Sequence, residues 1–364
     1  MSKIIIQNGN MCELDLPLKF AQKLYNEFAI RHPNAFYLRT RQRGMQNWDG
    51  KIHYITKTGQ FKIGLLPKVY DMCIEMGIKP KVVDMRQPLP KVSKVVTNIG
   101  KYKLRPEQEK AVKSVINNRV GDTPFHIGVL DYTVNAGKTL IMSSLYLTYK
   151  KQLKTLLITN DSDWLNQARE EFKQYLPGED ITFVQGKVLN WSNFTIGMVQ
   201  SISRNMRFYQ KELSQIDMVL VDEADQGGSK QYQNVITRLF NTRIRIGLSG
   251  TIYMSKLAKD KVKNMNLECF FGKVIAEFKL KDSIKKGYST KTIVKMVPGK
   301  PWYGNWESDC ISYKEIYDDS ITENNTAWTM AYNRLRWNIN QGRYPALVVC
   351  KHIAHCENLY KFFK

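Results

Sequence analysis

The chain has 364 residues, which is enough for two or three domains with hydrophobic cores. Its 43% hydrophobic and 24% charged content is typical of a globular protein, and no apolar run approaches the roughly 20 residues that span a membrane. Lys and Arg number 55 against 33 Asp and Glu, and the resulting net charge of +22 is spread along the chain. We therefore expect a polyanionic partner, nucleic acid before any other, and no membrane association.

The first 95 residues predict a small α+β domain. Short strand-like runs (KIIIQ, KIHYITK) are mixed with helical stretches such as LKFAQKLYNEFAIRH. The prolines and lysines of QPLPKVSKVVTNIGKYK then predict a linker to the next domain.

A basic segment lies inside this first domain. Three arginines alternate with other residues in FYLRTRQRG: Arg39, Arg41 and Arg43. In a strand all three would project from one face, and the Asp49-Gly50 pair that precedes Lys51 is a hairpin-turn signal. We expect the arginines and Lys51 to contact nucleic-acid phosphates, the alternative being a solvated outer face of the sheet. Trp48 is expected to pack in the core rather than stack on a base.

Between about 96 and 280, apolar strand-like runs alternate with helical patterns. The runs are HIGVLDYT, TLLITN, FTIGMVQ, DMVLVDEA and RIRIGLSGT. This alternation predicts an α/β domain with a parallel sheet and helices on both faces.

The stretch DYTVNAGKTLIMSSL, residues 131–145, is typical of a phosphate-binding loop between a strand and a helix. Val134 to Gly137 can direct backbone N–H groups at a phosphate, Lys138 supplies positive charge, and Thr139 supplies a hydroxyl for Mg²⁺. The glycine that usually opens such a loop is replaced by Tyr132. The motif alone is short enough to occur by chance.

The stretch MVLVDEAD, residues 218–225, is a buried strand that ends in acids. Asp222 at the strand tip is suited to hold Mg²⁺ through water, and Glu223 to orient or deprotonate the attacking water. A solvated acidic turn would account for the acids alone, but not for their occurrence together with Gly-Lys-Thr after a separate strand. The two motifs together predict a nucleoside triphosphatase.

Two further segments fit this interpretation, each with a simpler alternative. In KLRPEQEKAV, Gln108 can read both the donor and the acceptor of adenine, which favours ATP over GTP, although the segment alone indicates only a helix start with Pro106 at its first position. In RIGLSGT, the hydroxyls of Ser249 and Thr251 can bond Asp225 and link hydrolysis to domain movement, or the segment is simply a turn.

The last segment, from about 281, resumes a strand pattern in KTIVKMVPG and ALVVC around a helical region, ITENNTAWTMAYNRLRWNI. Four possible zinc ligands lie close together: Cys350, His352, His355 and Cys356. We expect instead a strand over 344–350 and a helix over 353–363, with no zinc site. The six cysteines lack the spacing of a disulfide framework, which indicates a reducing cytosol.

The order of the motifs resembles that of superfamily 2 helicases: RPEQ, NAGKT, ITND, GMVQS, VDEAD and LSGT. Residues 36–55 and 64–77 are similar to the accessory domain of phage helicases in this superfamily, and IKKGYST and CKHIAHCENLYKFF are similar to their hinge and motif IV region. The resemblance implies an accessory DNA-binding domain over 1–95, a first RecA-like ATPase domain over 96–280 and an incomplete second one over 281–364.

The resemblance also implies a function and its site residues. The implied activity is an ATP- and Mg²⁺-dependent DNA helicase that remodels branched DNA, by fork regression and Holliday-junction migration. The implied location is the cytoplasm, which is that of the host cell if the protein is phage-encoded. LSGT in place of SAT, and TNDSDWL in place of a PTREL-type segment, favour DNA over RNA. The implied nucleotide and metal residues are Gln108, Asn135, Ala136, Gly137, Lys138, Thr139, Asp222 and Glu223, and the coupling residues are Asp225, Ser249 and Thr251. Gln200 and Ser201 match the region that grips the nucleic-acid backbone.

One departure from the family pattern affects the expected activity. The arginines of the QxxGRxxR motif would follow Lys364, and such arginines contribute about 10³–10⁵ in rate. We therefore expect weak ATP binding and slow hydrolysis unless a longer protein or a separate polypeptide supplies that half. Two other functions stay open: a restriction or nuclease motor subunit, for which no PD-(D/E)xK-like cluster is found, and a DNA-binding remnant without enzymatic activity.

Overall fold

The computed structural model describes residues 2–41, 44–149, 152–188, 190–252, 258–291, 315, 317, 321–322, 324–343 and 347–363. The chain forms two compact units, Met1–Lys291 and Thr292–Lys364. None of the helices in the described part is long and apolar enough to cross a membrane.

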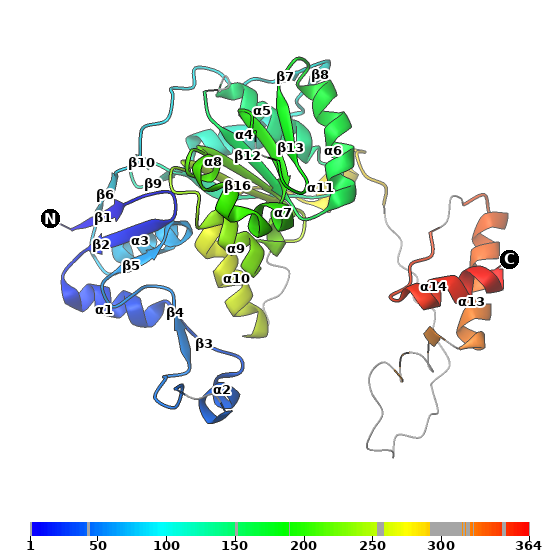
Figure 1. Cartoon of the computed structure of the whole chain (residues 1–364), viewed down its shortest axis with the longest axis horizontal. Helices are drawn as coiled ribbons and strands as arrows, with labels where there is room; N and C mark the ends of the chain where they lie inside the picture. Colours follow the sequence, from blue (N-terminus) through cyan, green and yellow to red (C-terminus); the bar gives the residue numbers. More distant parts are fainter. Residues whose placement is uncertain are drawn as a thin grey trace. The chain divides into compact units, whose positions relative to one another are not determined.

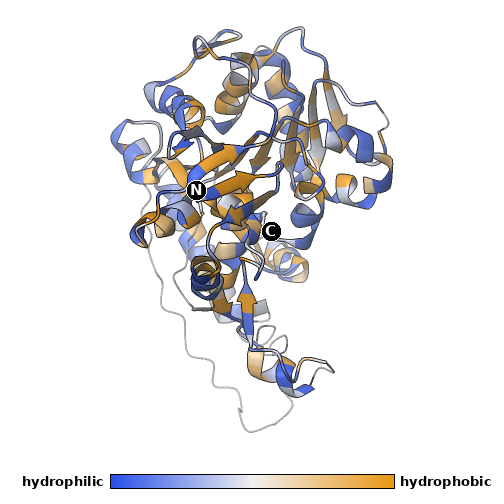
Figure 2. Ribbon diagram, turned by 90° about the vertical axis from the view of Figure 1, so that its left-hand side faces the viewer, coloured by the Kyte–Doolittle hydropathy of each residue, from blue (hydrophilic) through white to orange (hydrophobic). Residues whose placement is uncertain are grey.

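A seven-stranded parallel sheet forms the centre of the first unit (Figure 1), with the strand order β13-β14-β12-β15-β16-β11-β17. Its strands are β11 (His126–Tyr132), β12 (Thr155–Thr159), β13 (Ile181–Val184), β14 (Phe194–Met198), β15 (Met218–Asp222), β16 (Ile244–Ser249) and β17 (Val274–Phe278). The five predicted runs are β11, β12, β14, β15 and β16, which are mostly apolar because both faces of the sheet are covered there (Figure 2). The two edge strands, β13 and β17, were not predicted.

Helices cover both faces of this sheet, as predicted. One hydrophobic core lies under α4 (Pro106–Asn117), α5 (Lys138–Thr148) and α6 (Ser162–Tyr175). The other lies under α7 (Val199–Arg204), α8 (Gln210–Ser214), α9 (Lys230–Ile236) and α10 (Ala258–Phe271). Successive side chains of strand β15 point to opposite faces of the sheet, since Val219 and Val221 belong to one core and Leu220 to the other.

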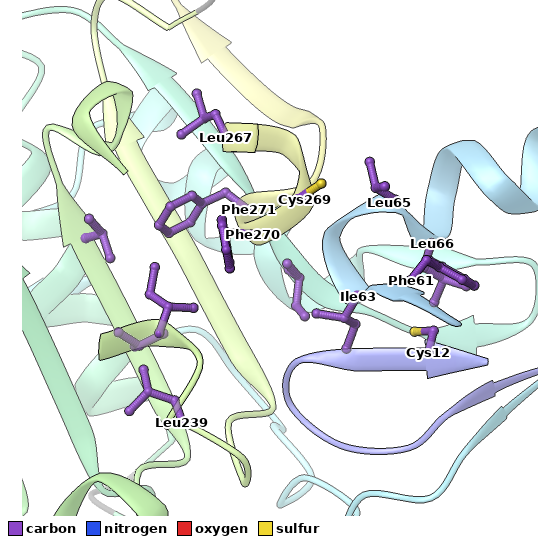
Figure 3. Packing of buried hydrophobic residues seen from close by; sticks show 14 of the residues in the cluster. Cys12, Phe61, Ile63, Leu65, Leu66, Leu239, Leu267, Cys269, Phe270 and Phe271 are labelled. Atoms are coloured by element: carbon purple, nitrogen blue, oxygen red, sulfur yellow. The ribbon is translucent and has the colours of Figure 1, made fainter. Parts of the chain in front are cut away.

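The N-terminal segment has its own four-stranded sheet, with the order β5-β2-β1-β6. Its elements are β1 (Lys3–Ile6), β2 (Met11–Asp15), α1 (Leu18–Glu27), β5 (Gln60–Lys62), η1 (Ile63–Leu65), α3 (Leu66–Glu75) and β6 (Lys81–Asp84). Its apolar side chains share a core with α10 on one face of the seven-stranded sheet, where η1 packs against α10 (Figure 3). Residues 85–97 then lead without helix or strand to β7 (Asn98–Ile99) and β8 (Tyr102–Lys103).

Arg245 joins this segment to the seven-stranded sheet. The side chain is fully buried on β16, and its Nη2 donates to Gly9 O at 2.6 Å and to Asn10 Oδ1 at 2.8 Å. Gly9 is required there, because a Cβ would lie 2.5 Å from Leu239 O. The β1–β2 turn is therefore packed against the seven-stranded sheet, while the domain boundary near residue 95 stays a prediction.

The basic segment is an arm rather than a hairpin. Strand β3 (Ala29–Arg31) pairs with β4 (Lys51–His53), and helix α2 (Ala35–Arg41) lies in the connection (Figure 1). The predicted strand at Arg39 and Arg41 is wrong, since Ala, Leu and Arg favour a helix and β4 already pairs with β3. The predicted Asp49-Gly50 hairpin turn is also wrong: the pair leads from the helix into β4, where Asp49 Oδ1 accepts from Lys51 N. Arg43 lies outside the described residues.

The second unit contains α13 (Asn325–Asn340) and α14 (Ile353–Phe363), which confirms both helices predicted there. Trp328 and Tyr332 of α13 contact the ring of Phe362 of α14 edge to face. The strand predicted over 344–350 is wrong where it is described: residues 347–350 are not a strand, and no described residue of this unit forms a strand that could pair with them. Most of KTIVKMVPG, and residues 344–346, lie outside the described residues.

Short elements complete the first unit. They are β9 (Arg119–Val120), β10 (Thr123–Pro124), η2 (Met206–Phe208), η3 (Ala224–Gln226) and α11 (Leu280–Lys285).

Candidate nucleotide and magnesium site

The phosphate loop and the acidic strand end lie at the same edge of the sheet. In the parallel register, Asp131 of β11 pairs with Ser249 of β16, and Leu248 of β16 pairs with Asp222 of β15. The loop that follows β11 and the acids that end β15 are thus separated by one strand only. Carboxyl edges of parallel sheets are where ligands of α/β proteins bind.

The loop residues have the backbone conformation of an anion-binding nest. Asn135 and Gly137 have positive φ angles of 61° and 75°, and Gly137 is the residue that precedes α5. A Cβ on Gly137 would meet Gln108 Nε2, the end of a flexible side chain, so the positive φ is the stronger reason for glycine here. Lys138 and Thr139 then open α5, whose N-terminal N–H groups and dipole favour a phosphate.

Tyr132 has a structural role at the position where a glycine usually opens the loop. Its ring is buried, and its hydroxyl donates to Glu107 O at 2.8 Å. The aromatic residue thus fixes the end of β11 against α4 and stays out of the loop.

Lys138 meets both acids of the VDEAD motif. Its Nζ lies 3.0 Å from Glu223 Oε1 and 3.5 Å from Asp222 Oδ1. Burial opposes the charge of Lys138, but the two carboxylates outweigh it and raise the pKa of the ammonium above its ordinary value. The sequence motifs, 85 positions apart between Lys138 and Glu223, are therefore one cluster in space.

Asp222 is a carboxylate with unused hydrogen-bonding capacity. Burial, the largest cause, raises its pKa, and Lys138 opposes this effect. Its Oδ1 is buried and accepts no hydrogen bond from any described residue. Such an acceptor fits a magnesium ion or one of its waters, for which oxygen ligands are preferred. The donor set of Asp222 and Thr139 therefore fits Mg²⁺.

Glu223 has a strained backbone. Its φ of 50° and ψ of 52° place a non-glycine residue in the left-handed region, at the turn from β15 into η3. Such conformations cost about 1–3 kcal/mol and concentrate at functional sites. The turn directs the Glu223 carboxylate to Lys138.

Gln108 has no free amide group in this structure. Its Nε2 donates to Ala136 O at 2.8 Å, and its Oε1 accepts from Arg105 N at 2.8 Å. Pro106 is the first residue of α4, as predicted, and Gln108 closes a capping box with Arg105. The structure thus connects Gln108 to the phosphate loop, and adenine reading stays a prediction.

Sequence reasoning missed a group of residues beside the loop. Arg105 donates to Asn135 O at 3.1 Å and stacks on the Tyr288 ring at 4.2 Å. Glu107 accepts from Lys286 Nζ at 2.7 Å, and Lys279 pairs with Asp131. The RPEQ motif contains Arg105 and Glu107, but their partners follow β17, and no sequence pattern indicates those contacts.

The predicted coupling residues are partly brought together. Ser249 Oγ donates to Asp225 Oδ1 at 3.1 Å, as expected. The Thr251 hydroxyl lies 3.3 Å from Ser249 Oγ, so Thr251 connects to Asp225 through Ser249.

The residues predicted to contact nucleic acid lie on separate elements. Gln200 and Ser201 begin α7, where Gln200 Nε2 donates to Asn160 O at 3.2 Å and Ser201 Oγ accepts from Gly186 N at 3.0 Å. Arg39, Arg41 and Lys51 belong to the arm. Trp48 is half-buried beside them rather than in a core, and its Nε1 donates to Lys51 O at 2.8 Å.

The fold and this cluster together define an α/β domain with a candidate nucleotide and magnesium site at the carboxyl edge of its parallel sheet. Residues 101–254 match the family described as Type III restriction enzyme, res subunit. Among individual proteins, the chain is 22% identical over 228 residues to the ATP-dependent DNA helicase uvsW of Enterobacteria phage T4. That alignment covers 57% of this chain and 43% of the relative, so the chain spans less than half of the relative's length.

Solved structures with the same fold include two of UvsW from bacteriophage T4. The first has a TM-score of 0.58 at 21% identity and covers 76% of this chain and 99% of that one. The second has a TM-score of 0.59 at 19% identity and covers 100% of this chain and 72% of that one. These likenesses show the RecA-like fold.

Proposed function

We propose that this protein is an ATP-dependent DNA motor that remodels branched DNA, such as regressed forks and Holliday junctions. The observation that carries the proposal is the contact of Lys138 with Asp222 and Glu223 at the mouth of a phosphate loop. The net charge of +22 supports a nucleic-acid partner, and the likeness to a phage DNA helicase supports DNA as that partner.

Each residue of the cluster has a distinct task in the proposed reaction. The loop N–H groups from Asn135 to Gly137 and the Lys138 ammonium bind the phosphates of ATP. Thr139 and Asp222 would hold Mg²⁺, and the bound ion would neutralise charge on the phosphates. Glu223 orients the attacking water and accepts its proton.

Nucleotide binding requires an exchange of partners for Lys138. The Lys138 ammonium is paired with the carboxylates of Asp222 and Glu223 in this structure. On nucleotide binding, an ATP phosphate would become the partner of the ammonium, and Mg²⁺ would become the partner of the Asp222 carboxylate. Glu223 then becomes free to act as a base. In the proposed cycle, this exchange of partners couples nucleotide binding to the hydrogen bond between Asp225 of η3 and Ser249 at the end of β16.

The ATP site is proposed to be completed by arginines from a second motor half, either in a longer protein or in a separate polypeptide. Turnover by residues 1–364 alone should then be slow, because an arginine finger contributes about 10³–10⁵ in rate.

The direct test is phosphate release by the full chain with and without forked DNA. We expect slow, Mg²⁺-dependent turnover that forked DNA stimulates. Glu223→Gln should bind ATP but lose at least about a hundredfold in turnover, because the base is removed and the loop is intact. Equal turnover in Glu223→Gln and the unchanged chain would contradict the proposed mechanism, and turnover that no DNA affects would contradict the motor.

A further inference from the structure

The arm, residues 29–53, exposes two adjacent aromatic rings at its end. Phe36 and Tyr37 of α2 are 79% and 56% exposed. The arm extends away from both sheets of the first unit (Figure 1), so these rings do not contribute to either core. Adjacent exposed aromatic residues on a short surface helix are typical of a binding surface.

The same arm is strongly basic. Its sequence contains a single acid, Asp49, against five basic residues: Arg31, Arg39, Arg41, Arg43 and Lys51. The acid is occupied, since Asp49 Oδ2 lies 2.7 Å from His53 Nε2. None of the four cations Arg31, Arg39, Arg41 and Lys51 forms an ion pair with a carboxylate of the described residues, so their charges are available to an anion.

Helix α2 carries both aromatic and basic side chains on its exposed faces. Phe36, Arg39 and Thr40 have helical i, i+3 and i, i+4 spacing and line an open groove of about 480 Å³. Arg31 and Lys51 of the arm's two strands line the same groove. On the next face, the Arg41 guanidinium lies over the Tyr37 ring at 5.2 Å. Ala35 of α2 is buried, and its Cβ lies close to Gly50, where an added Cβ would be 3.1 Å away.

We propose that this basic aromatic face binds single-stranded DNA at a junction, with Phe36 or Tyr37 stacked on an unpaired base and Arg39 and Lys51 on the adjacent phosphates. The proposal rests on the proposed DNA function and assigns the structure-selective contact to this arm. Stacking on aromatic rings suits any base, and cations beside the rings suit the backbone. Charge complementarity favours this occupant over an apolar protein segment, which would leave the cations unpaired.

The test measures binding of the full chain without nucleotide to two probes. One is a forked DNA whose first unpaired base is 2-aminopurine, and the other is a blunt duplex of the same length. Phe36→Ala/Tyr37→Ala should weaken fork binding about fivefold or more and restore 2-aminopurine fluorescence, while duplex binding changes little. Phe36→Trp should retain the fork affinity. Leu18→Ala, which also truncates a largely exposed apolar side chain, is the matched control outside the arm.

A second pair of variants separates stacking from charge. Arg39→Ala/Lys51→Ala should weaken binding to both probes and lower the salt slope on the duplex by about two. Unchanged fork affinity in Phe36→Ala/Tyr37→Ala would overturn this inference and leave the proposed motor function standing. Fork binding lost as expected in a chain that hydrolyses no ATP would contradict the motor instead. If 2-aminopurine fluorescence does not change when the unmodified chain binds, no base stacks and the arm serves a different partner.

Discussion

At the scale of single residues, Ser249 is the contact between the strand end beside the phosphate loop and Asp225 of the acidic motif. Its hydroxyl donates to Asp225, and Thr251 contacts only Ser249 in this group. We predict that Ser249→Ala removes the effect of DNA on the affinity for ATP, with little change in affinity without DNA. Thr251→Ala should have a smaller effect, since its contact with Asp225 is indirect.

The measurement is the dissociation constant of a fluorescent ATP analogue with and without forked DNA. Coupling between the two ligands appears as the ratio of the two constants, which is about 5–150 for typical coupled sites. Equal ratios in Ser249→Ala and the unchanged chain would show that the hydrogen bond does not carry the coupling.

The sequence predicts that four candidate site residues lie together, because their positions depend on local structure. Lys138, Thr139, Asp222 and Glu223 each follow a strand or open a helix, so a parallel sheet brings them to one edge. Gln108 is different. Its side chain bonds the loop carbonyl of Ala136, and this depends on how α4 approaches β11, which no local pattern specifies.

At the scale of elements, α4 and the phosphate loop support one another through Gln108 and Gly137. We predict that Gly137→Ala destabilises the fold by at least about 1 kcal/mol, because the left-handed conformation disfavours a Cβ. The contact with Gln108 Nε2 adds to this cost.

A double-mutant cycle measures the contact itself. Gln108→Ala removes the amide that a Cβ would strike, so Gly137→Ala should cost less in that background, by about 0.5 kcal/mol or more. Urea unfolding of the two single variants and the double variant gives the interaction energy. An additive result would mean that the loop relaxes away from α4.

The elements that the sequence predicted wrongly differ from the others in a physical way. Buried strands such as β15 can be recognised in the sequence as apolar runs. The edge strands β13 and β17 are only partly buried, so their sequences lack such a run. The alternating arginines of the arm fit a strand or a helix equally well. The pairing of β3 with β4, which is not local, decides between them.

At the scale of the whole first unit, the four-stranded N-terminal sheet and the seven-stranded sheet share a core (Figure 3). Burial lowers the pKa of the Arg245 guanidinium to about 9, which means that the fold destabilises its charge. The acceptors Gly9 O and Asn10 Oδ1 in the N-terminal turn offset part of that cost. The shared core and these hydrogen bonds join residues that are far apart in the sequence. Composition alone therefore cannot reveal that the two sheets form one unit.

We predict that Asn10→Ala destabilises the first unit by about 1.5–3 kcal/mol, because a buried charged donor loses an acceptor. Gln7→Ala, an exposed position just before the same turn, should change stability by no more than about 0.5 kcal/mol. Urea unfolding followed by both far-UV circular dichroism and tryptophan fluorescence checks this. Equal stability of the two variants would contradict the structural role of the turn.

Equilibrium binding of a non-hydrolysable ATP analogue to the full chain tests whether Lys138 and Asp222 hold one Mg²⁺-triphosphate between neighbouring strand ends. We predict saturable binding that requires Mg²⁺, and binding at least about tenfold weaker in Lys138→Ala, since a phosphate would lose a charged hydrogen-bond donor. Equal affinity of Lys138→Ala and the unchanged chain, or binding that is indifferent to Mg²⁺, would contradict this prediction.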